Sequence, residues 1–152
     1  VSHFYEWSGA GMYNCEIAGG AMHRGDRLIS SIHFGFDHQW IYIRLDFTGA
    51  ANVDFPKGTG FRIDLFVPDK IPVTIQPADG TLNIQGKPDT RAELDSVLEV
   101  AFRRSDLWDD GFGELGFTVS VVADRQQLES WPDNEWIRLT VPKPDNELFW
   151  PQ

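Results

Sequence analysis

Hydrophobic and polar residues alternate along many short segments of this chain, and segment 40–47 is the clearest case. Successive side chains of a β-strand point to opposite faces, so this segment predicts a strand with one face in a core. The other face carries aromatic rings and opposite charges. It is either a sheet surface held by an Arg–Asp pair or a surface that docks a partner or a glycan. Its outward residues are Trp40, Tyr42, Arg44 and Asp46.

The same alternation predicts further strands, and Gly, Pro and Asp residues mark the turns between them. The turn 37–39 joins the strand 28–36 to 40–47 as a hairpin, and a turn near 79–80 joins two more strands. We expect a helical turn at 104–108, with Ser105 as its N-cap. The expected loops are 8–21, 48–60 and 87–93, with a polar bend or strand end at 125–129. The remaining expected strands are 3–7, 61–67, 73–76, 82–85, 94–102, 115–123 and 136–141.

About nine short strands without a sustained helical period predict an all-β fold. We expect residues 1–152 to form a single antiparallel β-sandwich, jelly-roll-like with immunoglobulin-like layers and at most one or two short helical turns. The length of 152 residues suits one domain, and the hydrophobic fraction of 41% suffices for a core. Since the chain begins at Val1 without a methionine, we interpret it as a mature product or a fragment of a larger multidomain protein.

The formal net charge of −10 changes the picture of the partners. Such a surface repels nucleic acid and anionic membranes, whereas a neutral sugar remains compatible with it. No apolar run approaches the roughly 20 residues that span a bilayer. The single Cys15 excludes an internal disulfide and a cysteine-rich zinc site, and leaves a cytoplasmic or a secreted location equally open.

Three passages resemble the C-terminal β-sandwich region attached to bacterial glycoside hydrolase family 57 proteins, which act on α-glucans. They are Phe4-Tyr5-Glu6-Trp7-Ser8-Gly9-Ala10-Gly11, Gly20-Ala21-Met22-His23-Arg24, and Ile32-His33-Phe34-Gly35-Phe36-Asp37 leading into Leu45-Asp46-Phe47. Segments 94–102 and 115–119 are similar to that region as well. They also resemble the wider group of glucodextranase C-terminal modules, DOMON domains and family 9 carbohydrate-binding modules. The chain departs from that group at Arg103-Arg104, where a proline often follows the preceding strand.

This resemblance implies a soluble bacterial protein and an accessory domain rather than an enzyme. The family's catalytic Glu and Asp lie in a separate barrel domain, and a barrel needs about 200 residues or more. The residues themselves agree, because no nucleophile–base–orienter set is visible. The four histidines lack the spacing of a zinc helix. A DOMON-like haem site is weakly supported, because Met12 and Met22 both fall in a glycine-rich segment.

An acidic, glycine-containing segment at 106–114 raises calcium as a cofactor, because calcium takes six to eight oxygen ligands and often binds in such loops. The spacing is not that of an EF-hand, and a solvated acidic turn is the favoured interpretation. The candidate ligands are Asp106, Asp109, Asp110 and Glu114.

Six tryptophans are more than one core of this size should need. Flat rings pack on the C–H faces of sugars while polar side chains bond the hydroxyls. Trp131 precedes a Pro132-Asp133-Asn134 turn and is expected to be the exposed ring. If the outward faces of three strands adjoin, their charges form an Arg/Asp lattice with Trp at its margin. The candidate carbohydrate-binding residues are Trp40, Tyr42, Arg44, Asp46, Arg62, Asp64, Trp131, Trp136 and Arg138.

Two functions remain open on the sequence. One is a non-catalytic accessory module of a multidomain α-glucan-active glycoside hydrolase that binds carbohydrate or positions the substrate. The other is a structural module whose outer face packs on the catalytic domain of the parent chain or on another subunit.

Overall fold

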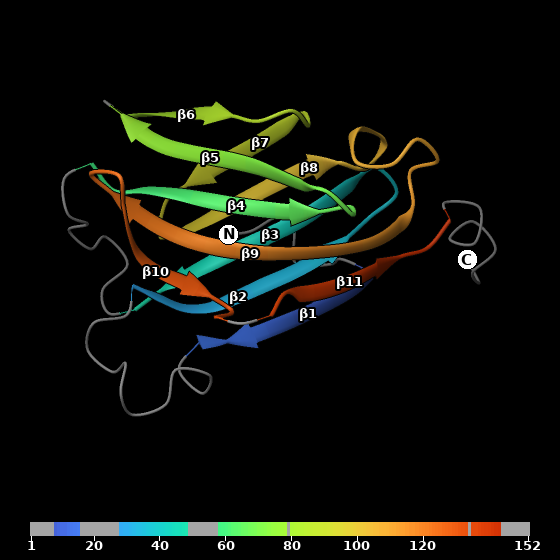
Figure 1. The fold of residues 1–152 in the computed structure, drawn as a ribbon, viewed down its shortest axis with the longest axis horizontal. Helices are drawn as coiled ribbons and strands as arrows, with labels where there is room; N and C mark the ends of the chain where they lie inside the picture. The colour runs from blue at the N-terminus through green and yellow to red at the C-terminus, as the bar shows by residue number, and fades with distance from the viewer. Residues whose placement is uncertain (1–7, 16–27, 49–57, 79, 134, 144–152) are drawn as a thin grey trace.

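Two antiparallel β-sheets pack face to face as a β-sandwich (Figure 1), which confirms the predicted fold class. The computed structural model describes residues 8–15, 28–48, 58–78, 80–133 and 135–143. The strands are β1 (Ser8–Asn14), β2 (Ile29–Phe36), β3 (Trp40–Phe47), β4 (Gly60–Phe66), β5 (Lys70–Ala78), β6 (Thr81–Gln85), β7 (Thr90–Leu94), β8 (Val97–Arg103), β9 (Gly113–Ala123), β10 (Gln126–Trp131) and β11 (Ile137–Val141), with a 3-10 turn, η2 (Arg104–Asp106), after β8.

The first sheet, called sheet A, has the strand order β1-β2-β3-β8-β7, and the second, sheet B, has the order β10-β9-β4-β5-β6. Strand β11 pairs with the first half of β9, ahead of the segment that β10 covers. Aromatic pairs join the sheets across the core. The rings of Phe34 and Phe117 lie 5.7 Å apart edge to face, and those of Phe47 and Phe61 lie 5.7 Å apart. Each pair takes one ring from each sheet, so the sheets bury their apolar faces against each other.

The predicted alternation is confirmed most fully in the short strand β11. Its Ile137, Leu139 and Val141 are buried, whereas Arg138 and Thr140 are exposed. Strand β8 likewise buries Leu98, Val100 and Phe102 in the core. Strand β2 does not follow one unbroken alternation of inward and outward side chains, because its register with β3 shifts between Ile29 and Ser31. This bulge turns Ile29 into the core together with Ile32, where an unbroken alternation would have placed Ser30.

Two segments expected as loops are strands. Residues 8–14 form β1, whose Gly11 lies against the ring of Phe34, and a Cβ there would come 2.7 Å from the ring. The glycines that suggested a loop instead allow this close approach. Residues 90–94 form β7, an edge strand. The segment has only two hydrophobic residues that face inward, Ala92 and Leu94, and the charged Arg91 and Glu93 between and beside them make it look like a polar loop.

In the segment 125–129, expected as a polar bend or strand end, residues 126–129 belong to strand β10 and Arg125 lies in the turn before it. Asp124 and Arg125 both have a positive φ, 51° and 66°, and connect β9 to β10 as a two-residue hairpin turn. Such turns usually contain Gly or Asn, so a turn of Asp and Arg escapes recognition from sequence. The N-cap of η2 is Arg103 rather than the predicted Ser105.

Arg104 holds three distant segments together where the sandwich closes at one end. This residue is 2% exposed, and the hydrogen bonds of its guanidinium reach main-chain carbonyls of three segments. Nε donates to Gly111 O at 2.8 Å, one terminal nitrogen to Asp37 O at 2.6 Å, and the other to Pro142 O at 2.7 Å. Asp37 follows β2 in sheet A and Pro142 follows β11 in sheet B, so one guanidinium joins both sheets.

Replacing Arg104 with alanine should lower the free energy of unfolding by roughly 3 kcal/mol or more, because several buried carbonyls lose their donor. The neighbouring Arg103 provides a matched control, since its guanidinium is partly exposed and pairs with exposed Asp89. Arg103→Ala should cost less than about 1 kcal/mol. Urea denaturation of both variants measures the difference, and equal losses would contradict the role given to Arg104.

Candidate functional site

The candidate sugar-binding residues divide between the two sheets. Trp40, Tyr42, Arg44 and Asp46 lie on β3 of sheet A, whereas Arg62 and Asp64 lie on β4 of sheet B. The continuous Arg/Asp lattice is therefore not formed, because β3 and β4 are not neighbours. Periodicity identifies the side of a strand that faces outward, but it does not identify the sheet to which the strand belongs. Two separate outer surfaces result.

On the outer surface of sheet A, the aromatic rings are occupied by internal partners. The guanidinium carbons of Arg91 and Arg103 each lie 4.5 Å from the ring centroid of Trp40, which is only 9% exposed. The hydroxyl of Tyr42 donates to the carboxylate of Asp37. Burial and this hydrogen bond raise the pKa of Tyr42 well above its ordinary value, so the phenol stays protonated and remains a donor.

The carboxylate of Asp37 also organises the hairpin between β2 and β3. Its Oδ1 accepts hydrogen bonds from the main-chain N–H groups of Gln39 and Trp40, at 2.9 and 2.8 Å. This local arrangement explains why an aspartate starts the turn, since Asp side chains readily bond the backbone two or three residues on. Asp37 thereby places Trp40 and Tyr42 together at the start of β3.

Arg44, His33 and Asp46 form the charged part of this surface. The guanidinium of Arg44 donates to both carboxylate oxygens of Asp46, at 2.8 and 3.0 Å, and is buried. His33 Nε2 lies 3.3 Å from the same carboxylate. Burial acts to raise the pKa of Asp46, but the hydrogen bonds from His33 and Arg44 outweigh it and hold that pKa below its usual value.

Ser31 lies beside His33 and Asp46, but these three residues do not form a catalytic triad. Ser31 Oγ and Asp46 Oδ2 approach the same nitrogen, Nε2, at 3.2 and 3.3 Å. A relay needs the hydroxyl at one ring nitrogen and the carboxylate at the other. The group therefore matches a polar cluster that stabilises the sheet surface.

The outer surface of sheet B offers a ring that is open to a ligand. Trp136, just before β11, is 41% exposed and stacks on Phe66 of β4, with centroids 4.1 Å apart and planes 6° from parallel. Gly116 of β9 lies beneath the indole, and a Cβ there would come 2.7 Å from Trp136 Cε3. The missing side chain at Gly116 makes room for the indole, so Phe66 and Gly116 both help to set its position.

A second indole lies on the same strand in a similar way. Trp108 covers Gly113 of β9, where a Cβ would come 2.5 Å from the indole Nε1. Gly113 has a φ of +156°, which further disfavours any side chain at this position. Both rings line one cleft of about 430 Å³, which we call the indole cleft. It is lined by Trp136, Trp108, Phe66, Pro68, Glu114 and Arg138, among others.

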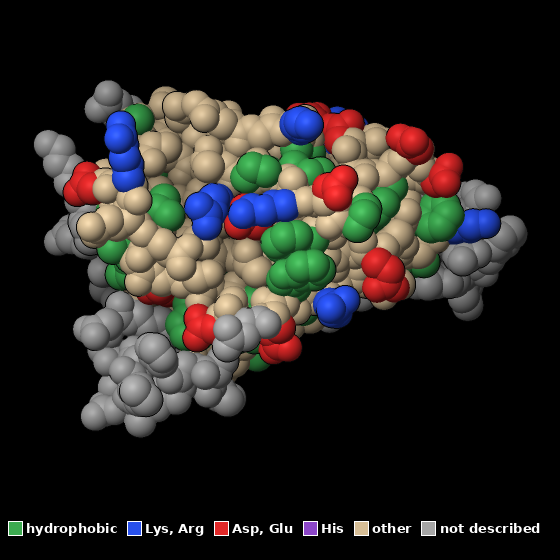
Figure 2. All heavy atoms as spheres, in the orientation of Figure 1, with side chains coloured by type: hydrophobic (Ala, Val, Ile, Leu, Met, Phe, Trp, Pro, Cys, Tyr) green, Lys and Arg blue, Asp and Glu red, His purple; other side chains and the backbone are tan. Residues whose placement is uncertain are grey.

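Polar groups flank the indole cleft. The guanidinium carbon of Arg138 lies 5.5 Å from the Trp136 ring centroid, and this side chain is exposed. Glu114 accepts a hydrogen bond from Thr140 Oγ at 3.0 Å and keeps acceptor capacity to spare. On β4, Asp64 lies two residues before Phe66 on the same face, with Arg62 Nε 3.4 Å and Lys70 Nζ 3.8 Å from its Oδ2. Figure 2 shows this mixture of apolar and charged side chains over sheet B.

Trp131 is not the exposed ring that the following turn suggested. It is 5% exposed, and its Nε1 donates to Glu129 Oε2 at 2.8 Å. Glu129 also accepts from the main-chain N–H groups of Leu28 and Ile29, at 2.6 and 3.0 Å, and so ties β10 to the start of β2. Trp131 pairs with inward-facing Val119, so its position on β10 turns the ring into the core despite the adjacent turn.

The four acidic residues considered for calcium do not converge. Asp106 Oδ2 accepts from the main-chain N–H of Asp89 at 2.7 Å, while Glu114 bonds Thr140 beside the indole cleft. Asp109 and Asp110 line a separate pocket with His38. Within the described part of the chain, no group of three or more His, Cys, Asp or Glu side chains could hold a metal ion. Met12 is described and exposed on β1, whereas Met22 lies outside the described residues.

The sequence matches no protein-family model and no curated protein, so its own geometry carries the argument about function. Among the described residues, no helix is long and apolar enough to cross a membrane. The remaining resemblance passages at 4–7 and 20–24 lie outside the described residues, as do the predicted strand 3–7 and Trp7 and Trp150.

The lowered pKa of Asp46 predicts a pH dependence of stability. A carboxylate whose pKa is lower in the folded state stabilises the fold above the unfolded-state pKa, and this contribution is lost as the pH falls through the folded-state value. The difference in unfolding free energy between the wild type and Asp46→Asn should therefore be constant near neutrality and shrink below about pH 4. Urea titrations at several pH values measure it, and a difference that does not change with pH would refute the shift.

Proposed function

We propose that this chain is a non-catalytic accessory module that binds carbohydrate through the indole cleft. The observation that carries the proposal is the exposed indole of Trp136, which stacks on Phe66 and lies against Gly116. A large ring left in water at 41% exposure gains little from the fold itself. Its fixed orientation suits it to pack against the apolar face of a sugar ring, since little side-chain freedom is then lost on binding.

The polar groups at the cleft suit the hydroxyls of a neutral sugar. Arg138 supplies hydrogen-bond donors and Glu114 supplies acceptors, and both line the cleft with Trp136. A second ring, Trp108, lines the same cleft and could contact a neighbouring sugar unit. An uncharged polysaccharide also avoids repulsion from a chain whose net charge is −10.

An α-glucan is the polysaccharide we favour, and this choice depends on the sequence resemblance to the accessory region of family 57 glycoside hydrolases. On that interpretation the parent chain carries a catalytic domain elsewhere, and this module holds or positions its substrate. Calcium has no part in the proposed binding.

A second candidate is a structural module that packs on the catalytic domain or another subunit, and the surface of sheet A favours it. Its Tyr42, Arg44 and Glu99 are buried, although they lie on the face that points away from the core. Glu99 Oε2 also lacks a hydrogen-bond partner among the described residues. This surface stabilises a fixed arrangement of side chains and leaves little free ring area for a sugar.

The test is a calorimetric titration of the module with maltooligosaccharides, repeated for Trp136→Ala. We expect weak binding by the wild type, with a dissociation constant between about 1 mM and tens of micromolar. Trp136→Ala should weaken it by at least about tenfold, because the stacking surface is lost while the fold keeps its core.

Leu128→Ala is the matched control, since Leu128 is 45% exposed and does not line the indole cleft. It should leave the affinity unchanged. Absence of binding to maltooligosaccharides and to β-glucans alike would refute the carbohydrate proposal and leave the structural module as the better account.

A further inference from the structure

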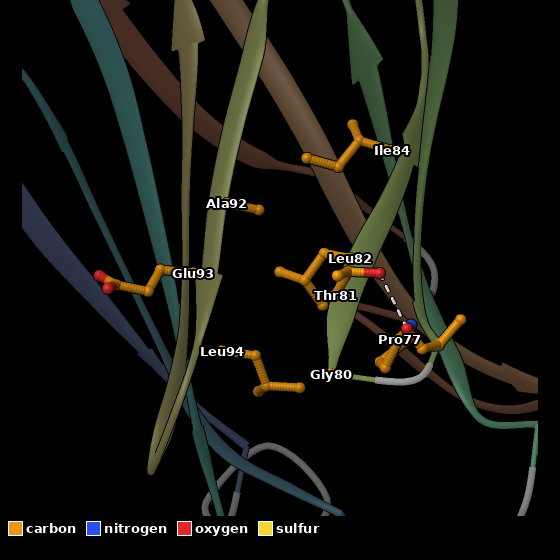
Figure 3. A pocket seen from close by; sticks show the side chains of 9 residues that line it. Pro77, Gly80, Thr81, Leu82, Ile84, Ala92, Glu93 and Leu94 are labelled. Carbon is orange, nitrogen blue, oxygen red and sulfur yellow. Dashed lines mark hydrogen bonds between the residues drawn. The ribbon is translucent and has the colours of Figure 1, made fainter.

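The two sheets end together at one side of the sandwich, where β6 closes sheet B and β7 closes sheet A (Figure 1). Among the described residues each of these strands pairs with one neighbour only, so each presents a row of main-chain N–H and C=O groups without a strand partner there. A groove of about 590 Å³ runs between them. Figure 3 shows Ala92 and Leu94 of β7 facing Leu82 and Ile84 of β6 across this groove, while Glu93 points away from it.

Strand β6 lacks the features that commonly prevent edge pairing, and β7 carries only two charged residues of opposite sign, Arg91 and Glu93. The edge strands β1 and β10 each have a register shift against their neighbour, whereas none occurs in β6 or β7. Strand β6, with the sequence TLNIQ, contains neither a charged residue nor a proline. Bulges, charges and prolines are the usual means of protecting an edge, so this side of the sandwich is open to strand addition.

The charges of β7 are complementary to those of a second β7. Arg91 and Glu93 lie on either side of Ala92 on the outward face. In an antiparallel pair centred on Ala92, Arg91 lies opposite the partner's Glu93, and Glu93 lies opposite the partner's Arg91. Opposite charges in direct cross-strand positions stabilise such a pair. Within the described residues the Glu93 side chain has no ion pair or hydrogen bond, and the Arg91 guanidinium carbon lies 4.5 Å from the centroid of the Trp40 ring.

Strand β6 can follow the same symmetry. Asn83 lies two residues before the end of β6, and Ala92 lies two residues after the start of β7, with one short connection between them. Asn83 and Ala92 are therefore the middle residues of their strands. Around Asn83, Leu82 would meet the partner's Ile84, with no charge on either strand.

We propose that a second copy of this chain docks on this edge, by antiparallel pairing of β7 with the partner's β7 about a two-fold axis at Ala92. The overall charge favours docking at this edge. Two chains of net charge −10 repel each other over most of their surface. At this edge β6 is uncharged, and each charge of β7 faces an opposite charge on its symmetry mate.

Charge reversal tests the pairing. In the Arg91→Glu dimer, both cross-strand pairs between positions 91 and 93 would join two glutamates. In the Glu93→Arg dimer, both pairs would join two arginines. Sedimentation velocity over a range of concentrations should show a dimer for the wild type. Each single reversal should raise the dimer dissociation constant at least about tenfold, because two attractive pairs become repulsive.

Two results separate this geometry from a general loss of structure. The doubly reversed chain, with Arg91→Glu and Glu93→Arg together, restores both opposite-charge pairs and should dimerise again. The two single variants should form a heterodimer when mixed, although each alone is monomeric. Glu135→Arg, which changes the net charge as much as Glu93→Arg at an exposed site off this edge, should leave the dimer intact.

A wild-type chain that stays monomeric at every concentration would overturn the proposal. So would a dimer that both single reversals leave unchanged, since the two copies would then meet on another surface. Sugar binding at the indole cleft is independent of either result.

Discussion

The buried guanidinium of Arg104 is the interaction on which the rest of the structure most depends. The guanidinium donates to the main-chain carbonyls of Asp37 after β2, Gly111 before β9 and Pro142 after β11. The main-chain N–H of Arg104 also donates to Gln39 O at 2.8 Å. By fixing Asp37, the guanidinium also fixes the carboxylate that receives the Tyr42 hydroxyl and the N–H of Trp40. A buried charge is costly unless its donors are satisfied, so this position admits few other side chains. Arg104, which directly follows β8, is thus the residue that closes the sandwich at this end.

The two outer surfaces differ in how their aromatic rings are used. On sheet A, Trp40 and Tyr42 are surrounded by the arginines and the aspartate that hold them, and this surface acts as a second, polar core. On sheet B, Trp136 stacks on Phe66 and lies against Gly116, with the Arg138 guanidinium carbon 5.5 Å from its ring centroid, and it is still 41% exposed. An aromatic ring that is both rigid and exposed can bind a ligand with little loss of conformational freedom. This contrast is the physical basis for placing the carbohydrate site on sheet B.

Much of the fold could be predicted from the sequence, because strand periodicity is a local property. The alternation in β3, β8 and β11 identified the inward residues correctly. The candidate site could be predicted only in part. The alternation correctly predicts that Trp136 and Arg138 point outward. No local pattern shows that Phe66 stacks on Trp136, or that two indoles lie against Gly113 and Gly116. These contacts join residues that are far apart in the sequence. Trp131 was misplaced because a turn sets the direction of the chain, whereas the strand register sets the direction of the ring.

The central claim is that a sugar lies on the Trp136 ring, and the indole N–H resonances of the tryptophans test it most directly. A two-dimensional spectrum of the module, with the indole resonances assigned, should be followed during titration with maltotriose. The account predicts that the Trp136 and Trp108 resonances shift together with added sugar, while those of buried Trp40 and Trp131 stay in place. Shifts confined to Trp40, or no shift at Trp136 in the presence of saturating sugar, would contradict it.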